Sequence, residues 1–175
     1  MQRVGMFHKV SFEQFKKDMT KTFGDMFAED VLLNVYKEIK LPERATSGSA
    51  GYDFFSPIFS VVHKGESVVI PTGIRCEMKK GWFLGIYPRS GQGFKYGIKL
   101  ANTVGIIDSD YYHSDNEGHI FIKFVNDSCI GEDVPLAPGI AMAQGIFMPY
   151  GIVHNDKTNA KRNGGFGSTD GKQSK

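Results

Sequence analysis

The residues best suited to chemistry lie in four short clusters spaced along the chain, and the third of these is the most acidic. Within residues 104–111, four largely apolar residues are followed by the acids Asp108 and Asp110. This pattern predicts a buried strand that delivers carboxylates to a rim, where Asp108 can orient and deprotonate a water molecule. The sequence therefore indicates hydrolytic chemistry in this region.

Other chemistries stay open for the same cluster. An Asp-x-Asp after an apolar strand is similar to the pattern of aspartyl-phosphate hydrolases, but Tyr112 stands where Thr or Val is expected and an α/β background is missing. A metal site is another interpretation, and so is a plain solvated loop. The side chains that could ligate a metal here are Asp110, His113, Asp115, Glu117 and His119.

Two clusters could bind phosphate. Residues 88–91 offer the donor fork of Arg89, the hydroxyl of Ser90 and the open backbone of Gly91, a combination suited to polyphosphate. Residues 162–169 are rich in Gly and hydroxyl side chains but are not a Walker loop. Taken singly, these clusters also fit a strand-end turn and a flexible tail. The first cluster, residues 49–53, is a stretch of small residues that ends in the carboxylate of Asp53.

The elements that must position these clusters follow from the periodicity of apolar residues. Residues 11–27 have one helical face of Phe and Met, with Ser11 and Gln14 at capping-box spacing. From residue 30 onward, short β-branched and aromatic runs alternate with Gly and Pro, which predicts strands at 31–36, 67–70, 82–87, 120–125 and 146–149. The fold class expected is all-β, with an amphipathic N-terminal helix that packs on its own domain or on a neighbouring subunit.

Length and charge limit the other possibilities. The chain has 175 residues, a net charge of +2 and two cysteines, Cys76 and Cys129. We expect one β domain at 30–154 between an N-terminal extension, 1–29, and a mobile C-terminal arm, 155–175. A nearly balanced charge does not favour direct nucleic-acid binding. The uncharged stretch 134–155 contains three Pro and three Gly, which excludes a membrane helix. The cysteine count suits a reducing compartment, so a cytoplasmic location is predicted.

Taken in order, the four clusters resemble the motifs of the trimeric dUTPase family. Four of the five family motifs are nearly complete, at residues 50–53, 88–91, 105–111 and 162–169, and the remaining one survives partly as Ala143-Gln144. The resemblance covers residues 31–169. It implies a distorted jelly-roll barrel, a homotrimer with sites between subunits, and Mg²⁺-dependent hydrolysis of dUTP to dUMP and pyrophosphate.

The resemblance also implies a role for individual residues. Asp108 is the base that activates water, Tyr111 underlies the deoxyribose, and Asp53 meets Mg²⁺ through water. The residues expected to read the uracil edge are Asn102, Ile106, Ile107 and Phe121. The residues expected to hold the phosphates are Arg89, Ser90, Gly91 and Gln144 of a second subunit. The arm of a third subunit closes the site with Arg162, Phe166, Gly167, Ser168 and Thr169.

The sequence departs from the family pattern at residues 113–117, which are inserted before Gly118, at residues 140–141 of the fourth motif, and in its N-terminal helix. Two alternative functions remain. A dCTP deaminase shares the fold, but Lys123 stands where that chemistry needs an acid. A nucleotide-gated binding partner could use the helix and the insertion as contact surfaces.

Overall fold

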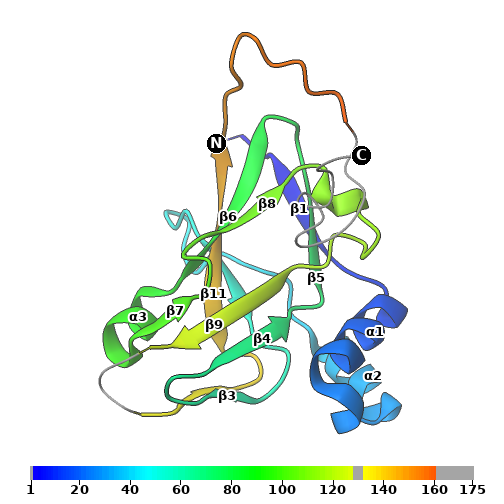
Figure 1. Cartoon of the computed structure of the whole chain (residues 1–175), viewed down its shortest axis with the longest axis vertical. Helices are drawn as coiled ribbons and strands as arrows, with labels where there is room; N and C mark the ends of the chain where they lie inside the picture. The colour runs from blue at the N-terminus through cyan, green and yellow to red at the C-terminus, as the bar shows by residue number, and fades with distance from the viewer. Residues whose placement is uncertain (1, 128–131, 161–175) are drawn as a thin grey trace, which may run out of the picture.

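Strands dominate the computed structural model, which describes residues 2–127 and 132–160 (Figure 1). Eleven strands form four antiparallel sheets in these ranges, with the orders β2-β11-β6-β8, β4-β9-β7, β1-β5 and β10-β3. The strands are β1 (Gly5–Lys9), β2 (Tyr52–Phe55), β3 (Ser60–Val62), β4 (Ser67–Pro71), β5 (Ile74–Met78), β6 (Trp82–Pro88), β7 (Ile98–Leu100), β8 (Gly105–Asp108), β9 (Phe121–Asn126), β10 (Val134–Leu136) and β11 (Ala141–Pro149).

The largest sheet is organised around β11, which pairs with β2 on one side and with β6 on the other. Its ladder with β6 runs from Ala143 opposite Pro88 to Pro149 opposite Trp82. Gly145 is required at the centre of β11, because a Cβ there would lie 2.8 Å from the Phe54 ring and 2.9 Å from Leu84. The absent side chain lets the layer beneath the sheet pack closely.

The prediction of a mostly β protein is confirmed, with two qualifications. Strands make up 35% and helices 23% of the residues that the structure describes, so the helical content is higher than the all-β expectation implied. The strands of the described residues also form four separate sheets and no closed barrel. Strands predicted at 67–70, 82–87, 120–125 and 146–149 correspond to β4, β6, β9 and the end of β11.

The amphipathic N-terminal helix is present as α1 (Phe12–Phe23). The Ser11 side chain caps it by accepting a hydrogen bond from Gln14 N at 3.1 Å, as the capping-box spacing predicted. The helix stops at Gly24, where φ is +63°, and the short turn η1 (Gly24–Met26) follows. Phe15 and Met19 are fully buried in the core, so α1 packs on its own domain.

The strand predicted at residues 31–36 is wrong, because these residues belong to the helix α2 (Glu29–Glu38). Glu29 and Asp30 occupy its first turn, where carboxylates complement the helix dipole. Leu32 is buried and Tyr36 packs against the core one turn later, which is helical spacing. Packing against α1 therefore outweighs the β propensity of the valines.

Cys76 lies on β5 with 1% of its surface exposed. Burial raises the pKa of its thiol to about 12, with a smaller contribution from the charge of Glu77. In a Cys129→Ser variant, we expect Ellman's reagent at pH 8 to label Cys76 about 10³-fold more slowly than a free thiol, because so little thiolate is present. Adding guanidinium should restore rapid labelling, whereas rapid labelling of the folded chain would contradict the burial.

Among the described residues, no helix has the length and apolar character needed to cross a membrane. Residues 155–160, the first part of the predicted arm, contain no helix or strand.

Candidate active site

An apolar pocket of about 660 Å³ opens between the edge of one sheet and the end of another. Its walls come from β4, β6, β7, β8 and β9 and from the turn that joins β7 to β8. Among the described strands, β8 pairs only with β6, and an edge strand presents one row of backbone N–H and C=O groups outward. The four residues predicted to read a uracil edge all line this pocket: Asn102, Ile106, Ile107 and Phe121.

Asp108 ends β8 at the rim of an adjoining cavity of about 740 Å³. Its side chain is exposed, as the predicted rim carboxylate requires. Ile106 lines both cavities, so a ligand held in the apolar pocket lies next to this carboxylate. Lys80 and Tyr150 also line the second cavity, and the sequence interpretation missed both. The only signal for Lys80 was its position in a Lys-Lys-Gly turn between two strands.

Tyr111 lies three residues beyond Asp108, at the start of the 3-10 turn η2 (Tyr111–His113). Its side chain is 3% exposed. The hydroxyl donates to the backbone carbonyl of His119 at 2.8 Å and accepts from Asn116 Nδ2 at 2.8 Å. The ring is thus fixed under the β8–η2 turn, and it does not line either of the two cavities described.

A second polar group forms at the other end of the main sheet. Arg89 Nε lies 3.1 Å from Asp53 Oδ1, and Asp53 pairs with Gln144 across β2 and β11. Gln144 Nε2 donates to the Pro88 carbonyl at 3.1 Å. A Cβ on Gly51 would lie 2.5 Å from Gln144 Oε1, so glycine leaves the space that the amide occupies. The structure therefore brings Arg89 and Gln144, which are predicted to bind phosphate, together with Asp53, which is predicted to meet Mg²⁺ through water.

The remaining residues of the second motif form a short helix that the sequence did not predict, α3 (Ser90–Tyr96). Ser90 and Gly91 lie in its first turn, directly after Arg89. Apart from its chain neighbours and the backbone of its own helix, no atom comes within 4 Å of a Cβ built on Gly91. The backbone here is accessible to a ligand.

These two groups lie far apart within one chain. Asp108 pairs with Phe83 near the beginning of β6, whereas Arg89 follows its last residue, Pro88. Six residues of extended strand span about 20 Å. A single chain therefore presents the pocket with Asp108 and the Arg89 group as two half-sites at opposite ends of one strand.

The metal-binding interpretation of residues 110–119 is wrong. Within residues 2–127 and 132–160, no group of three His, Cys, Asp or Glu side chains is arranged to hold a metal ion. Instead, Glu117 accepts hydrogen bonds from Ser11, and His119 bonds to Asp18. Glu117 and His119, two of the five proposed ligands, are therefore hydrogen-bonded to the N-terminal helix or to its N-cap.

Two further predictions concern this site. Lys123 lines the apolar pocket from β9, so a base held there meets a cation and not the acid that cytosine deamination needs. The five arm residues predicted to close the site lie outside the described residues: Arg162, Phe166, Gly167, Ser168 and Thr169.

Comparison with known proteins agrees with this geometry. The sequence model of the dUTPase family matches residues 37–170. The deoxyuridine 5′-triphosphate nucleotidohydrolase of Lactococcus lactis is 42% identical over 134 residues, which cover 75% of this chain and 88% of that protein. The protein of the same name from Psychromonas ingrahamii is 41% identical over 139 residues, covering 75% of this chain and 87% of that protein.

Solved structures are similar as well. The dUTPase of Streptococcus mutans superimposes with a TM-score of 0.60 at 38% identity, covering 66% of this chain and 90% of that chain. The dUTPase of phage phi11 of S. aureus shares the fold at 22% identity, with a TM-score of 0.59 over 71% of this chain and 92% of that one. The chain belongs to the dUTPase family. The family match begins after β1, α1 and most of α2, so these elements form an N-terminal addition to it.

Proposed function

We propose that this protein hydrolyses dUTP to dUMP and pyrophosphate at sites built between the subunits of a homotrimer. The observation that carries the proposal is the division of the site along β6: the base pocket and Asp108 lie at one end and the Arg89 group at the other. A nucleotide cannot bridge half-sites about 20 Å apart, whereas a rotationally symmetric assembly places the first half of one subunit against the second half of the next.

The apolar pocket binds the base. The edge of β8 offers a fixed pattern of backbone donors and acceptors, which matches uracil and leaves polar groups unpaired opposite the amine of cytosine. The ring of Tyr111 supports the β8–η2 turn from beneath, and the deoxyribose lies over this part of the chain, where no space is left for a 2′-hydroxyl. Asn102 and Phe121 complete the walls of the pocket.

The triphosphate binds Arg89, Ser90, Gly91 and Gln144 of the neighbouring subunit. The guanidinium of Arg89 is 41% exposed and already oriented by Asp53, so it can exchange part of this ion pair for phosphate oxygens. The arm of a third subunit closes the site with Arg162, Phe166, Gly167, Ser168 and Thr169.

The donor set fits a magnesium ion that arrives on the substrate. Mg²⁺ keeps several waters and needs only one or two protein carboxylates besides phosphate oxygens, and Asp53 supplies one such carboxylate beside Arg89. Asp53 would hold the ion through water. When bound, Mg²⁺ neutralises the charge on the phosphate oxygens. A structural Mg(II) ion is coordinated in a mutant dUTPase of phage phi11.

The chemical step needs one base. The Asp108 carboxylate accepts a proton from a water molecule, whose oxygen forms the new bond to the α-phosphorus. The bond from the α-phosphorus to the bridging oxygen breaks, and pyrophosphate leaves with the electron pair. Positioning and charge stabilisation carry the reaction, and no covalent intermediate is needed.

The proposal is tested by measuring pyrophosphate release from dUTP, UTP, dTTP and dCTP, with Mg²⁺ and with EDTA. We expect turnover of dUTP to exceed that of each other nucleotide by at least about 10²-fold, because the pocket penalises unpaired polar groups and added atoms. EDTA should remove most of the activity. Equal turnover of dUTP and dCTP, or ammonia released from dCTP, would contradict the assignment.

A further inference from the structure

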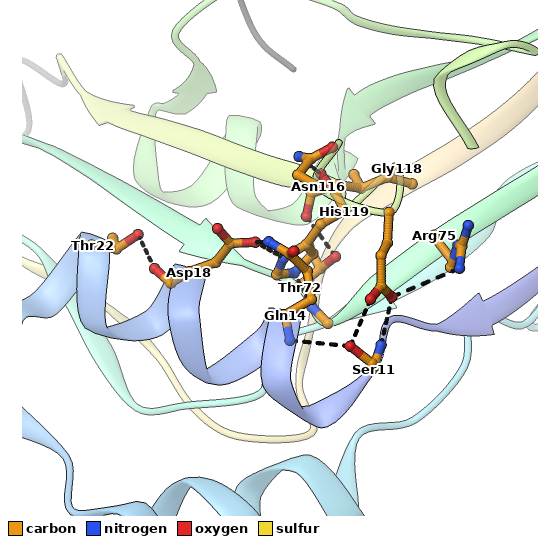
Figure 2. A network of polar contacts seen from close by, with 12 residues as sticks. Ser11, Gln14, Asp18, Thr22, Thr72, Arg75, Asn116, Gly118 and His119 are labelled. Atoms are coloured by element: carbon orange, nitrogen blue, oxygen red, sulfur yellow. Dashed lines mark hydrogen bonds and ion pairs between the residues drawn. The ribbon is translucent and has the colours of Figure 1, made fainter. Parts of the chain in front are cut away.

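The N-terminal addition contacts the segment that follows the catalytic motif. Helix α1 and its N-cap lie against residues 114–119 of the loop between η2 and β9. Three hydrogen bonds between two residue pairs, Ser11–Glu117 and Asp18–His119, join them across about a hundred residues of sequence (Figure 2). The same loop contains most of the insertion that distinguishes this chain from the family pattern. Two departures from the family pattern, the N-terminal addition and the inserted loop, thus contact each other next to Tyr111.

His119 is the centre of this contact. It is fully buried, and its ring is bonded on both sides. Gly73 N donates to Nε2 at 2.7 Å, so this nitrogen carries no proton and the neutral ring bears its proton on Nδ1. Nδ1 lies 2.6 Å from Asp18 Oδ2 of α1 and donates to it. The two bonds fix both the tautomer and the orientation of the ring.

Asp18 is 5% exposed and also accepts a hydrogen bond from Gln14 Nε2 at 2.7 Å. Burial alone would raise the pKa of this carboxyl, but the hydrogen bonds from His119 and Gln14 outweigh it and hold the pKa below its ordinary value. The side chain is therefore a carboxylate at neutral pH and a strong acceptor for the imidazole N–H.

The backbone of His119 continues the connection to the site. Its carbonyl accepts the hydrogen bond of the Tyr111 hydroxyl at 2.8 Å. Asn116 Nδ2 donates a hydrogen bond to the same hydroxyl at 2.8 Å. Gly118, at φ +70°, permits the loop to come this close, since a Cβ there would lie 2.7 Å from the Tyr111 carbonyl oxygen. The ring of His119 thus fixes the carbonyl that fixes Tyr111.

Glu117 forms a separate anchor for α1. Its carboxylate accepts from Ser11 N at 2.8 Å and from Ser11 Oγ at 2.6 Å, and it lies 3.7 Å from Arg75 Nη1. Glu117 thereby supplies from another segment the second half of the capping box, because the Gln14 side chain bonds to Asp18. This anchor holds the helix without touching Tyr111.

We infer that Asp18 of α1, acting through His119, is a positioning residue for Tyr111 and so contributes to the selection of deoxyribonucleotides. This inference rests on the proposed function, in which the turn that the Tyr111 ring supports leaves no space for a 2′-hydroxyl. When Asp18 is replaced, the carbonyl of His119 loses its fixed position and the Tyr111 ring gains freedom. Space then opens for the ribose of UTP while the catalytic carboxylate is unchanged.

The test compares kcat/KM for dUTP and UTP in Asp18→Ala, which removes the oxygen that accepts from both Gln14 and His119, in the backgrounds of the natural chain and of Tyr111→Phe. In the natural background, we expect the dUTP-to-UTP ratio to fall about tenfold, since a pocket rejects an added hydroxyl only weakly once its walls yield. In the Tyr111→Phe background, which lacks the hydrogen bond from the Tyr111 hydroxyl to the His119 carbonyl, Asp18→Ala should leave the ratio unchanged. The matched control is Thr22→Val, which removes only a hydrogen bond to the Asp18 carbonyl within α1 and should keep the ratio.

A milder variant keeps the test valid if Asp18→Ala does not fold. Gln14→Ala removes one of the two bonds to Asp18 and should shift the ratio in the same direction by a smaller factor. An unchanged ratio in the folded variants overturns the inference, and so does an equal fall in the Tyr111→Phe background. If the natural chain releases no pyrophosphate from dUTP, the proposed function itself fails, which is a distinguishable result.

Discussion

Replacing Asp108 by Asn should lower kcat for dUTP by about 10²–10⁴-fold, the range that a positioned general base contributes. The amide cannot accept the proton of the attacking water. Because Asp108 is exposed at the end of β8, the fold should not depend on it, and the thermal melting temperature should stay within a few degrees. Stopped-time assays of pyrophosphate release give kcat, and calorimetry with a non-hydrolysable α,β-imido analogue of dUTP gives the affinity.

Asp25→Asn is the matched control for this experiment, since it makes the same change at an exposed acid in η1, far along the chain from the site. The control should retain full activity. Loss of analogue binding in Asp108→Asn would assign the carboxylate to binding and not to catalysis. Retention of more than about a tenth of kcat would mean that another group activates the water.

The second large effect concerns the sharing of sites between subunits. Asp108→Asn and Arg89→Ala should each leave little activity alone, because Arg89→Ala removes the charge that faces the phosphates. When the two variants are co-expressed with different affinity tags and mixed trimers are isolated by both tags, each trimer contains one site with both natural residues. Activity should therefore return to about a third of the natural rate.

This recovery depends on the separation of the half-sites along β6. If Asp108 and Arg89 of the same chain served one site, every site in a mixed trimer would carry one defect and no activity would return. The matched control mixes two differently tagged preparations of Asp108→Asn, which should stay inactive. Size-exclusion chromatography with light scattering confirms that the isolated species contain three chains.

The local pattern of apolar residues was enough to predict the helices and strands that bury one face or one run of side chains. Helix α1 and strands β4, β6 and β9 follow from apolar periodicity, since each buries one face or one run of side chains. The pattern failed at α2, where Val31 and Val35 favour a strand by propensity but lie in a helix that buries Leu32 and packs Val35 against the core. It also missed α3, a helix of seven residues whose glycines suggested only a turn.

The resemblance named four residues that are expected to read uracil, and the structure places all four in the lining of one pocket; that they bind uracil stays a prediction. The contacts of the N-terminal addition could not be predicted, because Asp18 and His119 are separated by 101 positions and no local rule pairs them. For the same reason His119 and Glu117 were interpreted as possible metal ligands. Their partners become visible only when the helix and the loop are placed together in space.

The pairing of β1 with β5 bears on how the start of this chain tolerates change. Among the described strands, β5 has β1 as its neighbour over five residue pairs. Without β1, that row of amide groups would be open to strands of other molecules, the usual beginning of edge-to-edge aggregation. Strand β1 therefore covers the edge of β5. A purification tag placed ahead of the first residue leaves β1 in place, whereas a chain that starts after Lys9 lacks this strand.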